Sequence, residues 1–255
     1  DYAILVINGA DGVQGHTMTL WKLLKRYQVP VFIFVNKMDQ PGTDKEKTLA
    51  ELQKKLDVNC IDYNGQDKDC LYDTAAMCSE TLMEEYLNTG KISDEAMNEA
   101  IGHRQIFPCL FGSALKMEGV KELLAFMDAH MQRREYPEEF GARVFKIVRD
   151  EQDNRLTYMK ITGGSLKVKA MLTDYHEGME PSECWQEKAD QIRLYSGGTY
   201  DMVNEVTAGA VCAVTGLSKT FCGQGLGIET EPEQTVLEPV LTYRVILPQD
   251  CNVHD

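Results

Sequence analysis

The stretch Val31-Phe32-Ile33-Phe34-Val35-Asn36-Lys37-Met38-Asp39 decides the fold, because a continuous apolar run ends there in a polar turn. Five apolar residues in a row are typical of a strand in a parallel sheet that is covered on both faces. Ligands of open α/β sheets bind at the carboxyl ends of such strands. The polar residues after Val35 are therefore the first candidates for a binding site.

The segments around this strand predict an α/β unit. A similar apolar run, Tyr2 to Ile7, precedes it, and Ile106 to Phe111 predicts a third strand. Between the first two strands, one face of a helix is predicted by i, i+3, i+4, i+7 spacing; it comprises Leu20, Leu23, Leu24 and Tyr27. The helix after Gly119 is expected to bury Val120, Leu123, Leu124, Met127 and Met131. The result is a mostly parallel sheet with helices.

The region between the second and third strands contains an insertion. Thr43 and Glu46 form a capping box that predicts the start of a helix. Residues 57–78 are polar and are expected to be irregular, and two short helices follow, one over 79–88 and one that begins at Ser93. We expect a helical insertion at about 57–105.

A charged, proline-containing segment at 135–139 predicts the domain boundary, so that residues 1–135 form one domain and 136–255 another. Beyond the boundary the sequence has short runs rich in Val, Ile, Thr and Tyr that glycine turns separate. This pattern predicts an all-β barrel or sandwich. The expected strands are 142–149, 155–162, 165–172, about 190–195, 208–215, 225–230 and 240–247.

Composition limits the possible functions. The chain has 255 residues with 40 acidic against 26 basic side chains, a net charge of −14 that repels nucleic acid over most of the surface. Any RNA contact must therefore be local or lie outside this chain. No apolar run is long enough to cross a membrane. The eight cysteines form no C-x-x-C pair, which predicts reduced thiols in a cytosolic protein.

Asn36, Lys37 and Asp39 have the chemistry to recognise guanine. The Asp39 carboxylate offers two acceptors for the N1–H and N2 amino donors of guanine. Adenine lacks that amino group and would leave the carboxylate unpaired, so it would be rejected. We expect Asn36 to bridge loops and reach the base, and the aliphatic stem of Lys37 to cover the ring.

A second element, Gly112-Ser113-Ala114-Leu115, follows the predicted third strand. The small residues let the backbone approach a ligand closely, and the N–H of Ala114 is expected to donate to guanine O6. Asn36–Asp39 alone can also be a plain polar turn at a strand end. The two elements in this order favour a nucleotide site.

Together these residues resemble the fourth and fifth motifs of GTPases, and further matches resemble translational GTPases of the elongation factor G type. In the first domain, Gly12-Val13-Gln14 and Gly112 to Lys116 match that family, although His16 stands where the family usually has Gln. In the second domain, Arg155-Leu156 and Gly164-Ser165-Leu166 are similar to its barrel. The resemblance covers nearly the whole chain and is weakest at 57–78 and 174–190.

The resemblance implies the fold and the ligands. It implies part of a P-loop-type GTPase domain followed by the β-barrel called domain II in translation factors. Asn36, Lys37, Asp39, Ser113, Ala114 and Leu115 would bind GTP or GDP. The implied partner is the ribosome, both rRNA and ribosomal proteins, contacted mainly through the barrel and domains outside this chain, in the cytoplasm and without a membrane.

Catalytic elements are expected to lie elsewhere. The sequence contains no G-x-x-x-x-G-K-[ST] motif, so we expect a fragment without a phosphate cradle that does not hydrolyse GTP. Mg²⁺ would be bound only by the full-length parent. Asp62 to Gly65 fits the γ-phosphate motif Asp-x-x-Gly only formally. Cys251 to His254 has metal-ligand types but reads as a polar tail, and His103 and His130 lack a nucleophile partner, so we predict no catalytic or metal-binding residue.

Several alternatives stay open. Asp39 and Ser113 are separated by 73 residues, whereas a plain crossover unit needs about 30. The excess is smaller than expected of elongation factor G itself and is more similar to the tetracycline ribosomal protection proteins or release factor 3. The parent could therefore be a translocase, a protection protein or a termination-factor recycler. The rivals are a nucleotide-independent ribosome-binding module and an unrelated metabolic α/β enzyme.

Overall fold

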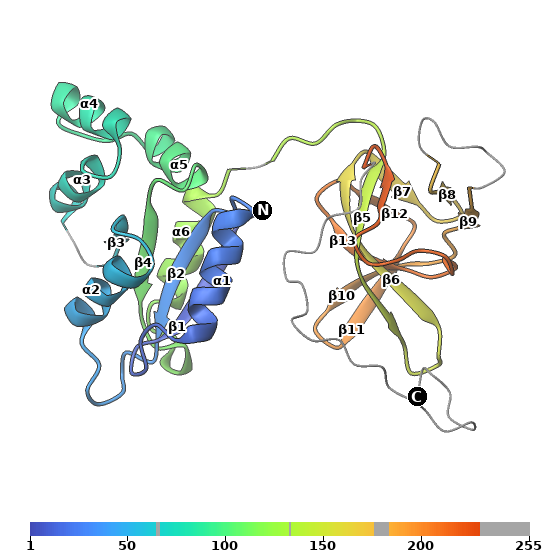
Figure 1. Cartoon of the computed structure of the whole chain (residues 1–255), viewed down its shortest axis with the longest axis horizontal. Helices are drawn as coiled ribbons and strands as arrows, with labels where there is room; N and C mark the ends of the chain where they lie inside the picture. The colour runs from blue at the N-terminus through green and yellow to red at the C-terminus, as the bar shows by residue number, and fades with distance from the viewer. Residues whose placement is uncertain (65–66, 133, 176–183, 230–255) are drawn as a thin grey trace. The chain divides into compact units, whose positions relative to one another are not determined.

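The computed structural model describes residues 1–64, 67–132, 134–175 and 184–229 (Figure 1). Its contacts divide the chain into two compact units, Asp1–Arg133 and Arg134–Asp255. The first unit contains helices and parallel strands, and the second contains antiparallel strands. The predicted fold class, an α/β region followed by an all-β region, is confirmed.

The first unit is built on four parallel strands in the order β1 (Ala3–Asn8), β2 (Val31–Asn36), β4 (Phe107–Phe111) and β3 (Cys60–Asp62). Every residue of β4 is buried, as are the first five of β2, because helices cover both faces of the sheet. The helices are α1 (Gly15–Arg26), α2 (Lys45–Lys55), α3 (Lys68–Ala76), α4 (Glu80–Thr89), α5 (Asp94–Gly102) and α6 (Val120–His130).

Two apolar clusters lie on opposite faces of this sheet. One contains Phe32 and Leu110 and extends to α5 and α6, and the other contains Ile33 and Cys109 and extends to α1 and α2. Neighbouring residues of one strand thus belong to different clusters, as the alternation of side chains along a strand requires. The two central strands, β2 and β4, are parallel and end at the same edge of the sheet, and apolar clusters pack against both of their faces.

Three expectations about local structure are wrong. Residues 57–78 are not irregular throughout, because they contain β3 and α3, which makes the predicted third strand the fourth. Helix α2 is capped by Asp44, whose carboxylate accepts a 3.0 Å hydrogen bond from the N–H of Lys47. The predicted cap, Thr43, instead donates its hydroxyl to the carbonyls of Met38 and Gln40 in the preceding turn.

The predicted helix faces are only partly correct, because some predicted members pack on the core and others do not. Those that pack on the core as expected are Leu24 on α1 and Val120, Leu123 and Met127 on α6. On α1, Leu20 and Tyr27 are exposed, and the buried residue is Trp21, which packs edge-on against Phe107 at 4.7 Å between ring centroids. On α6, Leu124 is exposed and Phe126 is buried. Aromatic rings bury more area than leucine does, so they determine which side of each helix faces the sheet.

The second unit contains a six-stranded antiparallel sheet and two strand pairs around one apolar cluster. The sheet order is β11 (Thr199–Val203), β10 (Ile192–Ser196), β13 (Val211–Val214), β6 (Arg155–Gly163), β5 (Gly141–Arg149) and β14 (Gly225–Gly227). The pairs are β12 (Glu205–Thr207) with β7 (Ser165–Lys167), and β8 (Met171–Thr173) with β9 (Gln186–Lys188).

The predicted strands of this unit need two corrections. The run 165–172 is not one strand but two, β7 and β8, because Lys169 between them has a φ of 70°. Strands β9, β11 and β12 have no counterpart in the predicted set. The expected strand at 240–247 lies outside the described residues. None of the helices in the described ranges is long and apolar enough to cross a membrane.

Candidate functional site

The polar turn after β2 is held by backbone contacts to the ends of the neighbouring strands. Asn36 ends β2, and its side-chain Oδ1 accepts a 2.8 Å hydrogen bond from the N–H of Lys37, which adopts a φ of 63°. The N–H of Met38 donates to the carbonyl of Gly112, at 3.0 Å, and the N–H of Gly9 donates to the carbonyl of Asn36. The turn is therefore fixed to the loops after β1 and β4.

The turn after β4 folds back on itself. Ser113 and Glu118 exchange two backbone hydrogen bonds of 3.0 Å, and Met117 between them has a φ of 60°. Gly112 is required here because a Cβ atom would lie 2.2 Å from the carbonyl oxygen of Glu118. The residues Ala114–Lys116 form one turn of 3₁₀-helix, η1, that closes this loop.

Two side-chain contacts join the turns after β2 and β4. The Oδ1 atom of Asn36 accepts a 2.9 Å hydrogen bond from the N–H of Ala114. The Nζ atom of Lys116 lies 3.3 Å from Oδ2 of Asp39. The Ala114 N–H, predicted to face a ligand, thus donates to Asn36 in this structure. The two turns lie at one edge of the sheet and converge, as binding of a single small ligand would require.

The carboxyl group of Asp39 is held in its charged form. The Ser113 hydroxyl lowers the pKa of Asp39 most, and Lys116 lowers it further, whereas partial desolvation opposes both. The Ser113 hydroxyl is buried and makes no other hydrogen bond among the described residues, so its O–H is available to orient toward the Asp39 carboxylate. Asp39 therefore presents an ionised pair of acceptor oxygens.

The six predicted site residues do not all face the same way. Asn36 is a bridge between loops, Lys37 is exposed, and Ser113 is 1% exposed. The side chain of Leu115 points outward and is 92% exposed, so only its backbone belongs to the loop. Lys116, one residue beyond the predicted set, contacts Asp39 and was missed. In the sequence, only its position directly after Ser-Ala-Leu indicates that it could belong to the site.

A third loop, after β1, borders the same edge, and its contact with α2 escaped prediction. Glu51 on α2 accepts hydrogen bonds from the N–H of Val13, at 3.2 Å, and from the Lys55 ammonium, at 2.6 Å. Gly12 has a φ of 66°, and a Cβ atom there would lie 2.3 Å from the Glu51 carboxylate. Nothing in the spacing of these residues indicates that α2 contacts this loop.

The other polar candidates have structural contacts. Asp62 forms an ion pair with Lys45 at 2.7 Å. The side-chain Oδ1 of Asn64 accepts a hydrogen bond from the N–H of Phe111. His130 is 6% exposed and lies between Asn98 and Tyr63, at 2.6 and 3.0 Å, and burial lowers its pKa. No cluster of metal-ligating side chains occurs among the described residues, which do not include Cys251 to His254.

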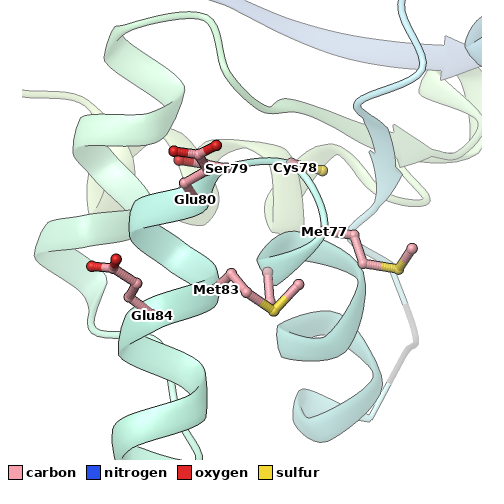
Figure 2. Close-up of a pocket in the computed structure, with 7 residues that line it drawn as sticks. Met77, Cys78, Ser79, Glu80, Met83 and Glu84 are labelled. Atoms are coloured by element: carbon pink, nitrogen blue, oxygen red, sulfur yellow. The ribbon is translucent and has the colours of Figure 1, made fainter.

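A cavity of about 430 Å³ lies away from these turns, where α3 meets α4 (Figure 2). Met77, Cys78 and Met83 supply its apolar lining, and Glu80 and Glu84 its polar lining. Burial raises the pKa of the Cys78 thiol to about 11, so the thiol stays protonated at neutral pH and is a poor nucleophile. The convergent polar groups of the sheet edge, rather than this cavity, form the candidate site.

Known proteins match the first unit and most of the chain. The family described as elongation factor Tu GTP binding domain matches residues 1–133. The chain is 26% identical to elongation factor G of Ureaplasma urealyticum serovar 10, over 96% of this chain and 45% of the relative. It is also 26% identical to the mitochondrial ribosome-releasing factor 2 of Drosophila ananassae, over 88% of this chain and 37% of the relative.

A crystal structure of a protein from Thermus thermophilus has the same fold, with a TM-score of 0.72 and 21% identity over 91% of this chain and 41% of that one. The chain spans less than half the length of each of these relatives. The resemblance to the elongation factor G type is confirmed, whereas a link to tetracycline protection stays a prediction. Because the family match covers residues 1–133 of 255, the chain belongs to the family of the elongation factor Tu GTP binding domain.

Proposed function

We propose that this chain is the guanine-recognising part, with an attached β-barrel domain, of a GTP-dependent translation factor that acts on the ribosome. The observation that carries the proposal is the convergence of the turns after β2 and β4, which Asn36 and Ala114 join at 2.9 Å. Convergence of an ionised carboxylate and a strand-end loop on one sheet edge is what guanine recognition requires.

The residues present fit guanine chemically. Asp39 is charged and 19% exposed at its side chain, so both oxygens can accept from N1–H and from the N2 amino group. The exposed stem of Lys37 is available to cover the ring. The Ala114 N–H would be shared between Asn36 and guanine O6, and Ser113 and Leu115 would frame this edge of the base.

GTP and GDP are the proposed ligands, and their phosphates would be held outside this chain. The sequence has no phosphate-cradling G-x-x-x-x-G-K-[ST] motif, so we assign phosphate binding, Mg²⁺ and hydrolysis to the longer protein. There the metal would neutralise charge on the phosphates. Within this chain, the residues at the sheet edge select and orient the base, and none is assigned a catalytic role.

The proposed partner is the ribosome, in the cytoplasm. The second unit would serve as domain II and contact rRNA and ribosomal proteins together with domains outside this chain. The names of the relatives support two versions of the function, because one is an elongation factor and the other a ribosome-releasing factor. Assays of translocation and of ribosome release with the full-length protein distinguish the two versions.

The test of guanine recognition is Asp39→Asn in the full-length protein. An amide at this position would pair with the N1–H and O2 of xanthine and would lose the second acceptor for guanine. We expect GDP affinity to fall and xanthosine diphosphate affinity to rise, measured by calorimetry or a fluorescent nucleotide. Undiminished GDP preference would contradict the proposal and favour a nucleotide-independent interaction module.

A further inference from the structure

Lys116 occupies a specific place in the turn after β4. Its N–H donates to the carbonyl of Ser113 at 3.1 Å, and the next residue, Met117, donates to Ala114 at 3.2 Å. The left-handed conformation of Met117 then reverses the chain. This tight turn directs the Lys116 side chain back across the loop, so that its Nζ lies 3.3 Å from Oδ2 of Asp39.

The Lys116 ammonium uses the same carboxylate that the proposed function reserves for guanine. Bidentate recognition needs both oxygens of Asp39, but one of them is paired with Lys116. We propose that Lys116 is an internal competitor for the guanine site, which must release Asp39 before the base binds and which pairs with it again when the base leaves. This inference rests on the proposed function.

The strength of the pair sets the size of the effect. The Lys116 side chain is 53% exposed and that of Asp39 is 19% exposed, so water and salt screen the attraction. An exposed pair of this kind weakens a competing ligand by about two- to fivefold. Lys116 therefore tunes nucleotide affinity and release without closing the site.

A second effect of Lys116 has the opposite sign. Its positive charge attracts the phosphates of the nucleotide over a longer range, and removal of the charge weakens binding for this reason. A single substitution measures the sum of the two effects. The two can be separated because competition requires the Asp39 carboxylate, whereas the attraction to phosphates does not.

The experiment uses the full-length protein and four variants. Lys116→Met removes the ammonium but keeps the length of the side chain, and Lys121→Met removes an exposed charge on α6 as the matched control. GDP affinity is measured for both at low and at high salt. The Lys116→Met effect is then measured again in an Asp39→Asn background with xanthosine diphosphate, where there is no carboxylate to compete for.

We expect Lys116→Met to improve GDP binding by about two- to fivefold relative to its effect on xanthosine diphosphate in the Asn background. The improvement should shrink at high salt, and Lys121→Met should not show it. The inference would be overturned if Lys116→Met improved GDP binding no more than it improves xanthosine diphosphate binding in the Asp39→Asn background. If Asp39→Asn itself leaves GDP binding intact, both this inference and the proposed function are wrong. If Asp39→Asn weakens GDP binding but Lys116→Met shows no relative improvement, only this inference is wrong.

Discussion

The Oδ1 atom of Asn36 accepts hydrogen bonds from the N–H of Ala114, at 2.9 Å, and from the N–H of Lys37, at 2.8 Å. Asn36 and Ala114 are separated by 78 positions in the sequence. Asn36 ends β2, whereas Ala114 lies in the turn that follows β4. One side chain thus sets the distance between the two turns of the candidate site. The loop positions are fixed by the protein itself, which lowers the ordering cost of ligand binding.

Asn36→Ala removes this link, and we expect two consequences. Stability should fall by about 0.5–1.5 kcal/mol, because water can replace the lost acceptor at this exposed site. Guanine nucleotide affinity of the full-length protein should fall by about tenfold, the factor that corresponds to the loss of one oriented hydrogen-bonding group. Urea unfolding measures the first effect and nucleotide titration the second.

Asn36→Asp is the matched control for this prediction. A carboxylate keeps acceptor oxygens for both N–H groups, so the link between the loops should survive and stability should stay close to that of the wild type. If Asn36→Ala and Asn36→Asp are equally stable, the hydrogen bond to Ala114 does not hold the loops together.

Gly112 provides a second test of how the site is built. A Cβ atom at this position would lie 2.2 Å from the carbonyl oxygen of Glu118, which is backbone and cannot move aside cheaply. We expect Gly112→Ala to destabilise the protein by about 1–3 kcal/mol, measured by urea unfolding. Gly15→Ala is the control, because a Cβ atom there meets nothing within 4 Å and should leave stability unchanged or raise it by up to about 1 kcal/mol. Equal stability of the two variants would contradict the tight packing at Gly112.

The fold class could be predicted from the sequence because buried strands and their polar ends are local signals. The run 31–35 and its continuation to Asp39 were sufficient to place a strand and a turn at the sheet edge. The helix faces were harder to predict, because several registers fit the same spacing. On α1 the buried residue is Trp21 rather than Leu20, and tertiary contact with Phe107 and Arg104 decides between them.

The residues of the candidate site could be predicted only where they come shortly after the end of a strand. Asn36 and Asp39 come directly after β2, and Ser113 and Ala114 after β4, so motif and position agree. Lys116 was missed because its contact with Asp39 depends on the φ of Met117, which the sequence does not reveal. Strands β9 and β12 were not predicted because each has only three residues, which give too little alternation to recognise.

The ion pair between Asp150 and Arg193 makes stability of the second unit depend on pH. Burial opposes the charge on Asp150, but hydrogen bonds from Arg193 and from Asn154 outweigh it and lower the Asp150 pKa to about 2. In an unfolded chain the pKa of an aspartate is about 3.9. A carboxyl group with a lowered pKa stabilises the fold above its unfolded value, and this contribution is lost as the pH falls toward 2.

Asp150→Asn should therefore change both the level and the pH profile of stability. At neutral pH we expect the variant to be less stable, because Arg193 is 5% exposed and would lose its charged partner. Between pH 4 and pH 2 its free energy of unfolding should decline less than that of the wild type, as measured by urea unfolding at each pH. Asp153→Asn is the control, since that side chain is 80% exposed in its pair with Arg149 and should behave like the wild type. If Asp150→Asn follows the wild-type profile down to pH 2, the pair with Arg193 contributes nothing to acid sensitivity.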